Sequence, residues 1–348
     1  MVESRPHLLG MTTPEFEELA VSMGQPKFRG RQIAARLYKQ NVSSLSDMPE
    51  LPASFRERLE GETVLRRIHI AAAAKSADGT TKFLLELEDG MAIEAVILPY
   101  EERVSVCVST QVGCAAGCIF CATAIGGLAR NLMAGEIVDE VLTLQRDSPR
   151  RITHVVYMGM GEPLLNYDEV LKSIRILNGE VGIAMRHITV STVGITPRIE
   201  KLAAERLQIT LAISLHAPND ALRRQIMPIA ERYPVEELIR ACRSYADSTH
   251  RRITFEYLLI RGLNDSVSLA HELAELLRGC LCNVNLIPYN AIEGLALNRP
   301  SRARVQAFRS VLEDAGIAVT QRVERGHAVS AACGQLRRRQ QAKSTLPH

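Results

Sequence analysis

From residue 104 onward, short apolar runs rich in β-branched residues alternate with segments of helical period. The helical segments include residues 134–147, 167–179 and 234–247. Strands that alternate with helices form a parallel sheet through right-handed crossovers. Six such units are too few to close an eight-stranded barrel, so the pattern predicts an α/β fold with an open, partial (βα)6 barrel. The expected strands are residues 104–110, 152–161, 187–194, 208–217, 253–260 and 283–289.

The first hundred residues show a different pattern, with short helices followed by a hairpin. TPEFEELAVSMG, at 13–24, opens with a helix-start signal, and RQIAARLYKQ, at 31–40, places an apolar stripe under basic residues. Residues 80–98 alternate around an Asp-Gly turn and predict a β-hairpin. We therefore expect a helical accessory domain at 1–75, a connecting hairpin at 76–100, the barrel core at 101–336 and a basic tail at 337–348.

Composition narrows the class of protein. The chain has 348 residues, 46% of them hydrophobic, but contains no apolar run long enough for a membrane helix. Its first twenty residues include acids and lack a signal-peptide core, so we expect a cytoplasmic protein with no membrane partner. A net charge of +3 is compatible with RNA binding without being diagnostic. Eight cysteines are too sparse for a disulfide scaffold.

Three cysteines lie close together in QVGCAAGCIFCATA, at 111–124. Structural zinc normally takes four ligands in two pairs, and thiol–disulfide enzymes use two cysteines. Three thiolates suit a four-iron, four-sulfur (4Fe-4S) cluster and leave one iron open to a substrate or cofactor. Cys114, Cys118 and Cys121 are therefore the predicted cluster ligands, with another kind of metal site as the alternative.

Polar and glycine residues follow several expected strands. In parallel α/β sheets, ligands bind at the carboxyl ends of the strands. The candidates at these ends are Gly161, Glu162, Ser191, Ser214, Leu215, His216 and Asn290.

The spacing C-x3-C-x2-C, with Phe120 before the last cysteine, is typical of radical S-adenosylmethionine (SAM) enzymes, and MGMGEPLLN resembles their GGEP motif. Over about residues 12–336 the chain resembles the RlmN/Cfr family of radical SAM RNA adenine methyltransferases. The resemblance is carried by FRGRQIAARLY, AIEAVILP, VCVSTQVGCAAGCIFCATA, RNLMAGEIVDEV, YMGMGEPLLN, ITVSTVGITPRI, LAISLHAPND, NLIPYN and SAACGQL.

The resemblance implies methyl transfer to C2 of an adenosine in 23S ribosomal RNA or transfer RNA, with two SAM per turnover. One SAM methylates Cys333. A radical from the second removes hydrogen from that methyl group, and the carbon then adds to the ring. Glu94 takes the ring proton, and Cys107 releases the product through a transient disulfide with Cys333. The strand-end candidates named above would bind SAM.

The resemblance also implies an electron donor such as a flavodoxin system, and we expect a monomer. The basic residues Arg29, Arg31, Arg36 and Lys39 are candidates for phosphate contact. The chain departs from the family at RGHAVSAACGQL, where His327, Ala328 and Ser330 replace three aspartates. The open alternatives are attack at C8, another RNA, a protein or small-molecule substrate, and a non-catalytic iron–sulfur or zinc protein.

Overall fold

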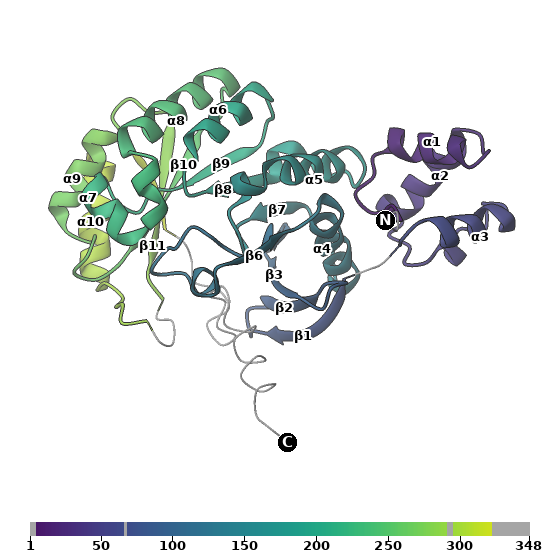
Figure 1. Ribbon diagram of the computed structural model, residues 1–348. Helices are drawn as coiled ribbons and strands as arrows, with labels where there is room; N and C mark the ends of the chain where they lie inside the picture. Colours follow the sequence, from purple (N-terminus) through teal and green to yellow (C-terminus); the bar gives the residue numbers. More distant parts are fainter. Residues whose placement is uncertain (1–4, 66–67, 291–294, 322–348) are drawn as a thin grey trace.

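The computed structural model describes residues 5–65, 68–290 and 295–321. A curved, open sheet forms the centre of the molecule, with helices packed along its outer side (Figure 1). A group of short helices near the N-terminus lies beside one end of this core (Figure 1).

The sheet has ten strands among the described residues, and its central part is parallel. The pairs from β4–β7 through β11–β12 are parallel, whereas the pairs β1–β2, β2–β3 and β3–β4 are antiparallel. The spatial order equals the chain order, apart from a separate two-stranded hairpin of β5 (Gln111–Gly113) and β6 (Leu128–Asn131). In order, the strands are β1 (His69–Lys75), β2 (Thr81–Glu86), β3 (Ala92–Pro99), β4 (Val104–Cys107), β7 (His154–Tyr157), β8 (Ile188–Thr192), β9 (Thr210–Ser214), β10 (Ile253–Leu259), β11 (Cys282–Pro288) and β12 (Ala318–Gln321).

The helices of the core connect successive parallel strands and cover one face of the sheet. The main apolar cluster includes Val104, Val106 and Val155 on that face, while the intervening residues Ser105 and Cys107 point to the other. We call this second side the inner face. The connecting helices are α4 (Ala134–Asp147), α5 (Tyr167–Gly179), α6 (Thr196–Ala204), α7 (Asp220–Ile226), α8 (Val235–Thr249), α9 (Val267–Leu276) and α10 (Arg302–Asp314).

The inner face is polar along several strands, unlike the outer face. Asn285 on β11 donates to a carboxylate oxygen of Glu256 on β10 at 2.7 Å, and Thr320 on β12 donates to Asn285 at 3.1 Å. Thr254 donates to Asn283 at 3.1 Å nearer the start of the same strands. The alternation of apolar and polar residues thus gives a sheet whose outer face is apolar and whose inner face carries hydrogen-bonding side chains.

The N-terminal region consists of α1 (Thr13–Ser22), α2 (Phe28–Ala34), a π-helical turn at Ala35–Lys39 and α3 (Ala53–Glu62). Thr12 caps α1 through a capping box with Glu15. Helix α2 crosses α1 at Gly30, where a Cβ would lie 2.4 Å from the backbone of Phe16. The glycine is required because any side chain would force the two helices apart.

Three of the four basic residues proposed for phosphate contact are engaged inside this helical region. Arg36 makes a two-point ion pair with Glu50, and Arg31 pairs with Glu17. Arg29 donates to Gln32 and to the backbone carbonyl of Glu50. Lys39 is exposed. A phosphate contact by the three arginines would compete with these bonds.

The structure confirms the open barrel and all six expected strands, and differs from the sequence-based picture in two places. The expected hairpin of β2 and β3 is a continuous part of the main sheet, because β3 also pairs with β4 and β1 adds a further strand within residues 1–75. A seventh parallel strand, β12, was not expected. Both additions extend the inner face.

Candidate active site

The three clustered cysteines lie in the loop between β5 and β6. The loop is closed at its base by the hydrogen bond from the Cys114 amide to the carbonyl of Gly127, at 2.9 Å. Its tip is fixed to the end of α7, where the Ile119 amide donates to the carbonyl of Ile226. Phe120 packs edge-on against the ring of His216, with ring centroids 4.9 Å apart. The loop is thus held to the core by backbone bonds and one aromatic contact.

The chemistry of this donor set fits an iron–sulfur cluster. Burial, with smaller contributions from Glu162 and Cys121, raises the pKa of Cys114 to about 11. Burial likewise raises the pKa of Cys118, together with Cys121 and Cys114. Buried thiols that destabilise one another's charge need a strongly positive group to become thiolates, and metal binding supplies it. Within the described residues, no three Cys, His, Asp or Glu side chains gather as they would around a single ion.

The end of β7 passes very close to the end of β4. A Cβ on Gly159 would lie 2.6 Å from the carbonyl oxygen of Val108, and one on Gly161 would lie 2.7 Å from Thr110 and Gln111. Gly161 also has a φ of 104°, which disfavours any other residue. These glycines allow the Gly-Glu-Pro turn to lie directly over the start of the cysteine loop.

Glu162 joins the ends of two strands from a buried position. Its carboxylate accepts from the Val193 amide at 2.7 Å and from the Leu164 amide at 2.9 Å. Burial raises the pKa of Glu162 to about 7, although these hydrogen bonds oppose the shift. The carboxylate therefore orders the strand ends where SAM is predicted to bind.

Two polar residues that the sequence analysis did not single out connect the same strand ends. The Ser109 hydroxyl donates to the carbonyl of Glu94 at 2.7 Å and accepts from the Met160 amide at 2.9 Å. Gln111 accepts from the Glu162 amide at 2.8 Å and donates to Asn131 at 2.7 Å. Their position in the stretch STQ, directly after a strand, was the signal that could have identified them.

The predicted SAM residues on later strands lie in three different environments. Ser191 and Ser214 are half-buried on the inner face, at the ends of β8 and β9. The Leu215 side chain is fully buried in the apolar core, so only its backbone could make a polar contact with SAM. The Leu215 amide donates to the carbonyl of Glu256. Asn290 is exposed, and its side-chain oxygen accepts from Arg299 at 2.7 Å.

His216 has a structural contact of its own. Its Nδ1 accepts from the Leu258 amide at 3.0 Å, and its φ is 59°. Burial lowers the pKa of His216 to about 3, with a smaller effect from Arg223. The ring is therefore neutral and connects the end of β9 to β10 beneath Phe120.

Glu94 and Cys107 share the inner face on neighbouring strands. Val96 on β3 is directly opposite Cys107 on β4, and Glu94 lies two residues from Val96, on the same side of β3. Glu94 is only 4% exposed, whereas glutamates are mostly found at the surface of proteins. Its partner is Lys82 on β2, whose Nζ lies 3.1 Å from Oε2. Cys333, together with positions 327, 328 and 330, lies outside the described residues.

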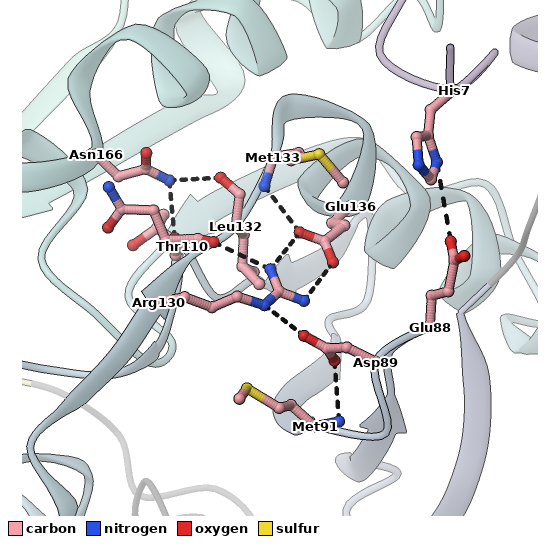
Figure 2. A network of polar contacts seen from close by, with 11 residues as sticks. His7, Glu88, Asp89, Met91, Thr110, Arg130, Leu132, Met133, Glu136 and Asn166 are labelled. Carbon is pink, nitrogen blue, oxygen red and sulfur yellow. Dashed lines mark hydrogen bonds and ion pairs between the residues drawn. The ribbon is translucent and has the colours of Figure 1, made fainter. Parts of the chain in front are cut away.

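Arg130 connects the cysteine hairpin to two other elements. It makes a two-point ion pair with Glu136 in the first turn of α4 and another bond to Asp89 in the β2–β3 turn (Figure 2). The hydrogen bonds that Arg130 donates to these carboxylates hold its pKa above the usual range. On the opposite side, Asn166 donates to the carbonyls of Thr110 and Leu132, which flank the hairpin (Figure 2).

An open parallel α/β barrel with a three-cysteine loop beside a Gly-Glu-Pro strand end defines a radical SAM enzyme. Residues 108–273 match the Radical SAM superfamily, and residues 6–65 match the ribosomal RNA large subunit methyltransferase N-terminal domain.

Full-length relatives agree. A probable dual-specificity RNA methyltransferase RlmN of Gloeobacter violaceus is 49% identical over 95% of each chain. The same-named protein of Alkaliphilus oremlandii is 48% identical over 95% of this chain and 97% of its own. A radical SAM methyltransferase from Sphaerobacter thermophilus has a similar crystal structure, with 46% identity, a TM-score of 0.91 and coverage of 95% and 98%. The chain belongs to the RlmN family of radical SAM methyltransferases.

Membership of this family establishes the two cofactors, a 4Fe-4S cluster and SAM. The three-thiol loop is where the structure offers ligands for the cluster. In the parts of the chain that the structure describes, no helix has the length and apolar character to span a membrane.

Proposed function

We propose that this chain is an RNA methyltransferase that adds a methyl group to C2 of an adenosine in 23S ribosomal RNA, with transfer RNA as a second candidate substrate. The observation that supports it most strongly is the shared inner face of Glu94 and Cys107 on β3 and β4, because β3 contacts β5, the strand that leads into the cysteine loop. The names of the relatives, RNA methyltransferases of dual specificity, support the RNA substrate.

The cluster is held by Cys114, Cys118 and Cys121. The SAM site is formed by the strand-end residues Gly161, Glu162, Ser191, Ser214, Leu215, His216 and Asn290. With SAM, the cluster supplies radical chemistry, which an electron-poor ring carbon such as adenine C2 needs because it cannot attack a methyl group as a nucleophile. The N-terminal helices contact the RNA, and a flavodoxin-type donor supplies electrons.

The remaining steps are carried out by three side chains of the protein. Cys333 carries the one-carbon unit as a methyl thioether before it reaches the ring, and two SAM are consumed per turnover. Glu94 accepts the proton that leaves the ring carbon. The Cys107 thiolate then attacks the sulfur of Cys333: the S–S bond forms, the S–C bond breaks, and its electron pair stays with the carbon, which takes up a proton to become the methyl group. Electrons from the donor then reduce the disulfide to the two thiols.

The test is nucleoside mass spectrometry of RNA from a host that lacks its own enzyme of this family. Ribosomal and transfer RNA are digested separately after expression of the wild-type chain and of Cys333→Ala and Cys242→Ala. We expect 2-methyladenosine with the wild type and with Cys242→Ala, because Cys242 is buried in the core away from the inner face. Cys333→Ala should give none.

Other outcomes contradict the proposal in different ways. A signal for 8-methyladenosine would show attack at C8. Methylation that survives in Cys333→Ala would exclude the methyl-cysteine route. No methylated adenosine at all, from protein with an intact cluster, would show that the substrate is another molecule.

A further inference from the structure

Lys82 forms an ion pair with Glu94 that is shielded from water. The two side chains are 1% and 5% exposed, and the charged atoms are 3.1 Å apart. Transferring two charges out of water costs several kcal/mol per ion, and well-packed apolar residues in such places are often at least as stable. Stability alone therefore gives little reason for a buried lysine in this strand.

The pair lies where the chemistry is proposed to occur. Lys82 is directly opposite Val96, and Val96 is directly opposite Cys107, so the three residues form a row across β2, β3 and β4. Directly paired residues point to the same face of a sheet, which puts Lys82, Glu94 and Cys107 together on the inner face. Their neighbours Phe83, Ile93 and Ala95 point the other way, into the apolar core.

A carboxylate that accepts a proton in a water-poor pocket has two requirements. Its charge needs compensation that does not come from water, and its oxygens need a fixed direction. The ammonium of Lys82 meets both, since its charge compensates the carboxylate and its contact with Oε2 fixes the direction of that oxygen. Lysine also suits the role because it is a compact charge on a stem that the apolar sheet can cover.

We propose that Lys82 is a positioning residue for methyl transfer: it compensates the charge of Glu94 and orients its carboxylate toward the ring proton. The inference rests on the proposed function, in which the proton moves to Glu94 while the electron pair of the C–H bond stays with the ring. Methylation of Cys333 involves no ring proton, so the two halves of the reaction should respond differently to loss of Lys82.

The experiment uses the full-length, cluster-loaded enzyme with methyl-labelled SAM and ribosomal RNA. Label in Cys333 is measured by peptide mass spectrometry and label in adenosine by nucleoside analysis. The variants are Lys82→Met, Lys82→Arg, Glu94→Gln and the double variant Lys82→Met/Glu94→Gln. Lys75→Met, an exposed lysine at the end of the adjoining strand β1, is the matched control.

We expect Lys82→Met to label Cys333 normally while RNA methylation falls by about a hundredfold, the lower range of what a positioned base contributes. Lys82→Arg should recover part of the loss, and Lys75→Met should resemble the wild type. The double variant should be within about twofold of Glu94→Gln, because a residue that acts through Glu94 adds nothing once Glu94 is neutral.

Normal RNA methylation by Lys82→Met would overturn the inference, and so would a double variant far slower than Glu94→Gln. Thermal melting monitors the folding of each variant. If Lys82→Met is unstable because it leaves the Glu94 carboxylate buried without Lys82, the double variant still tests the inference, since it removes both buried charges. If the wild type itself forms no methyladenosine, the proposed function fails and the outcome is distinct from failure of the role of Lys82.

Discussion

At the scale of single residues, the site combines groups whose ionisation is controlled by burial. His216 is the plainest case, because its ring is buried and its pKa is lowered to about 3. In the unfolded chain the pKa of this histidine is about 6.5. Between the two pKa values, His216 is therefore neutral in the folded protein and protonated in the unfolded chain. The stability that depends on neutral His216 is complete above about pH 6.5 and is lost as the pH falls toward 3.

We predict that His216→Asn makes the protein less sensitive to acid. Asparagine tolerates the left-handed backbone at φ 59° and offers an oxygen to the Leu258 amide in place of Nδ1. Between pH 7.5 and 5.5, the wild type should lose about 1.4 kcal/mol more unfolding free energy than the variant. Urea titrations at both pH values measure this difference. Equal losses in the two proteins would show that His216 does not titrate on unfolding.

At the scale of elements, the sequence predicted strands and helices best where the pattern was long and periodic. Residues 134–147 and 167–179 form α4 and α5 with the expected bounds. Strand β12 escaped prediction because Ala318–Gln321 is short and mostly exposed at the sheet edge. The buried state of Glu94 escaped because its partner, Lys82, lies across a strand pair, and such contacts leave no local signal.

The cysteine hairpin depends on an anchor that sequence spacing also does not reveal. Arg130 bridges Glu136 on α4 and Asp89 in the β2–β3 turn (Figure 2). We predict that Arg130→Met lowers the free energy of unfolding by about 1–2 kcal/mol, since a two-point pair with a second carboxylate is a network. It should also speed iron loss to a chelator, because the loop between β5 and β6 loses a support.

Arg175→Met is the matched control, since the exposed Arg175 side chain makes an ion pair with one carboxylate, that of Glu205. It should change stability by less than about 0.5 kcal/mol and leave iron loss unaffected. Denaturant melts and the absorbance of the cluster during chelation report the two effects. Identical behaviour of the two variants would mean that Arg130 does not anchor the hairpin.

At the scale of the whole molecule, the N-terminal helices are joined to the core through a close backbone contact. A Cβ on Gly135, at the start of α4, would lie 2.3 Å from the carbonyl oxygen of Leu9. Polar contacts lie around it: Lys172 pairs with Glu15 at 2.8 Å, and Thr13 bonds to Glu180 through its amide and hydroxyl. The core and the N-terminal region therefore fit together only while position 135 carries no side chain.

We predict that Gly135→Ala separates the two regions without unfolding the core. The added methyl group meets backbone, which cannot rotate away, so the contact should weaken by about 1–3 kcal/mol. Limited proteolysis should then cut within residues 6–65 faster, and RNA methylation should fall while labelling of Cys333 persists. Gly61→Ala, in α3 with open space around its Cβ, is the control and should change neither. If Gly135→Ala methylated RNA at the wild-type rate despite faster cleavage, the N-terminal helices would not need to be docked for RNA to reach the inner face.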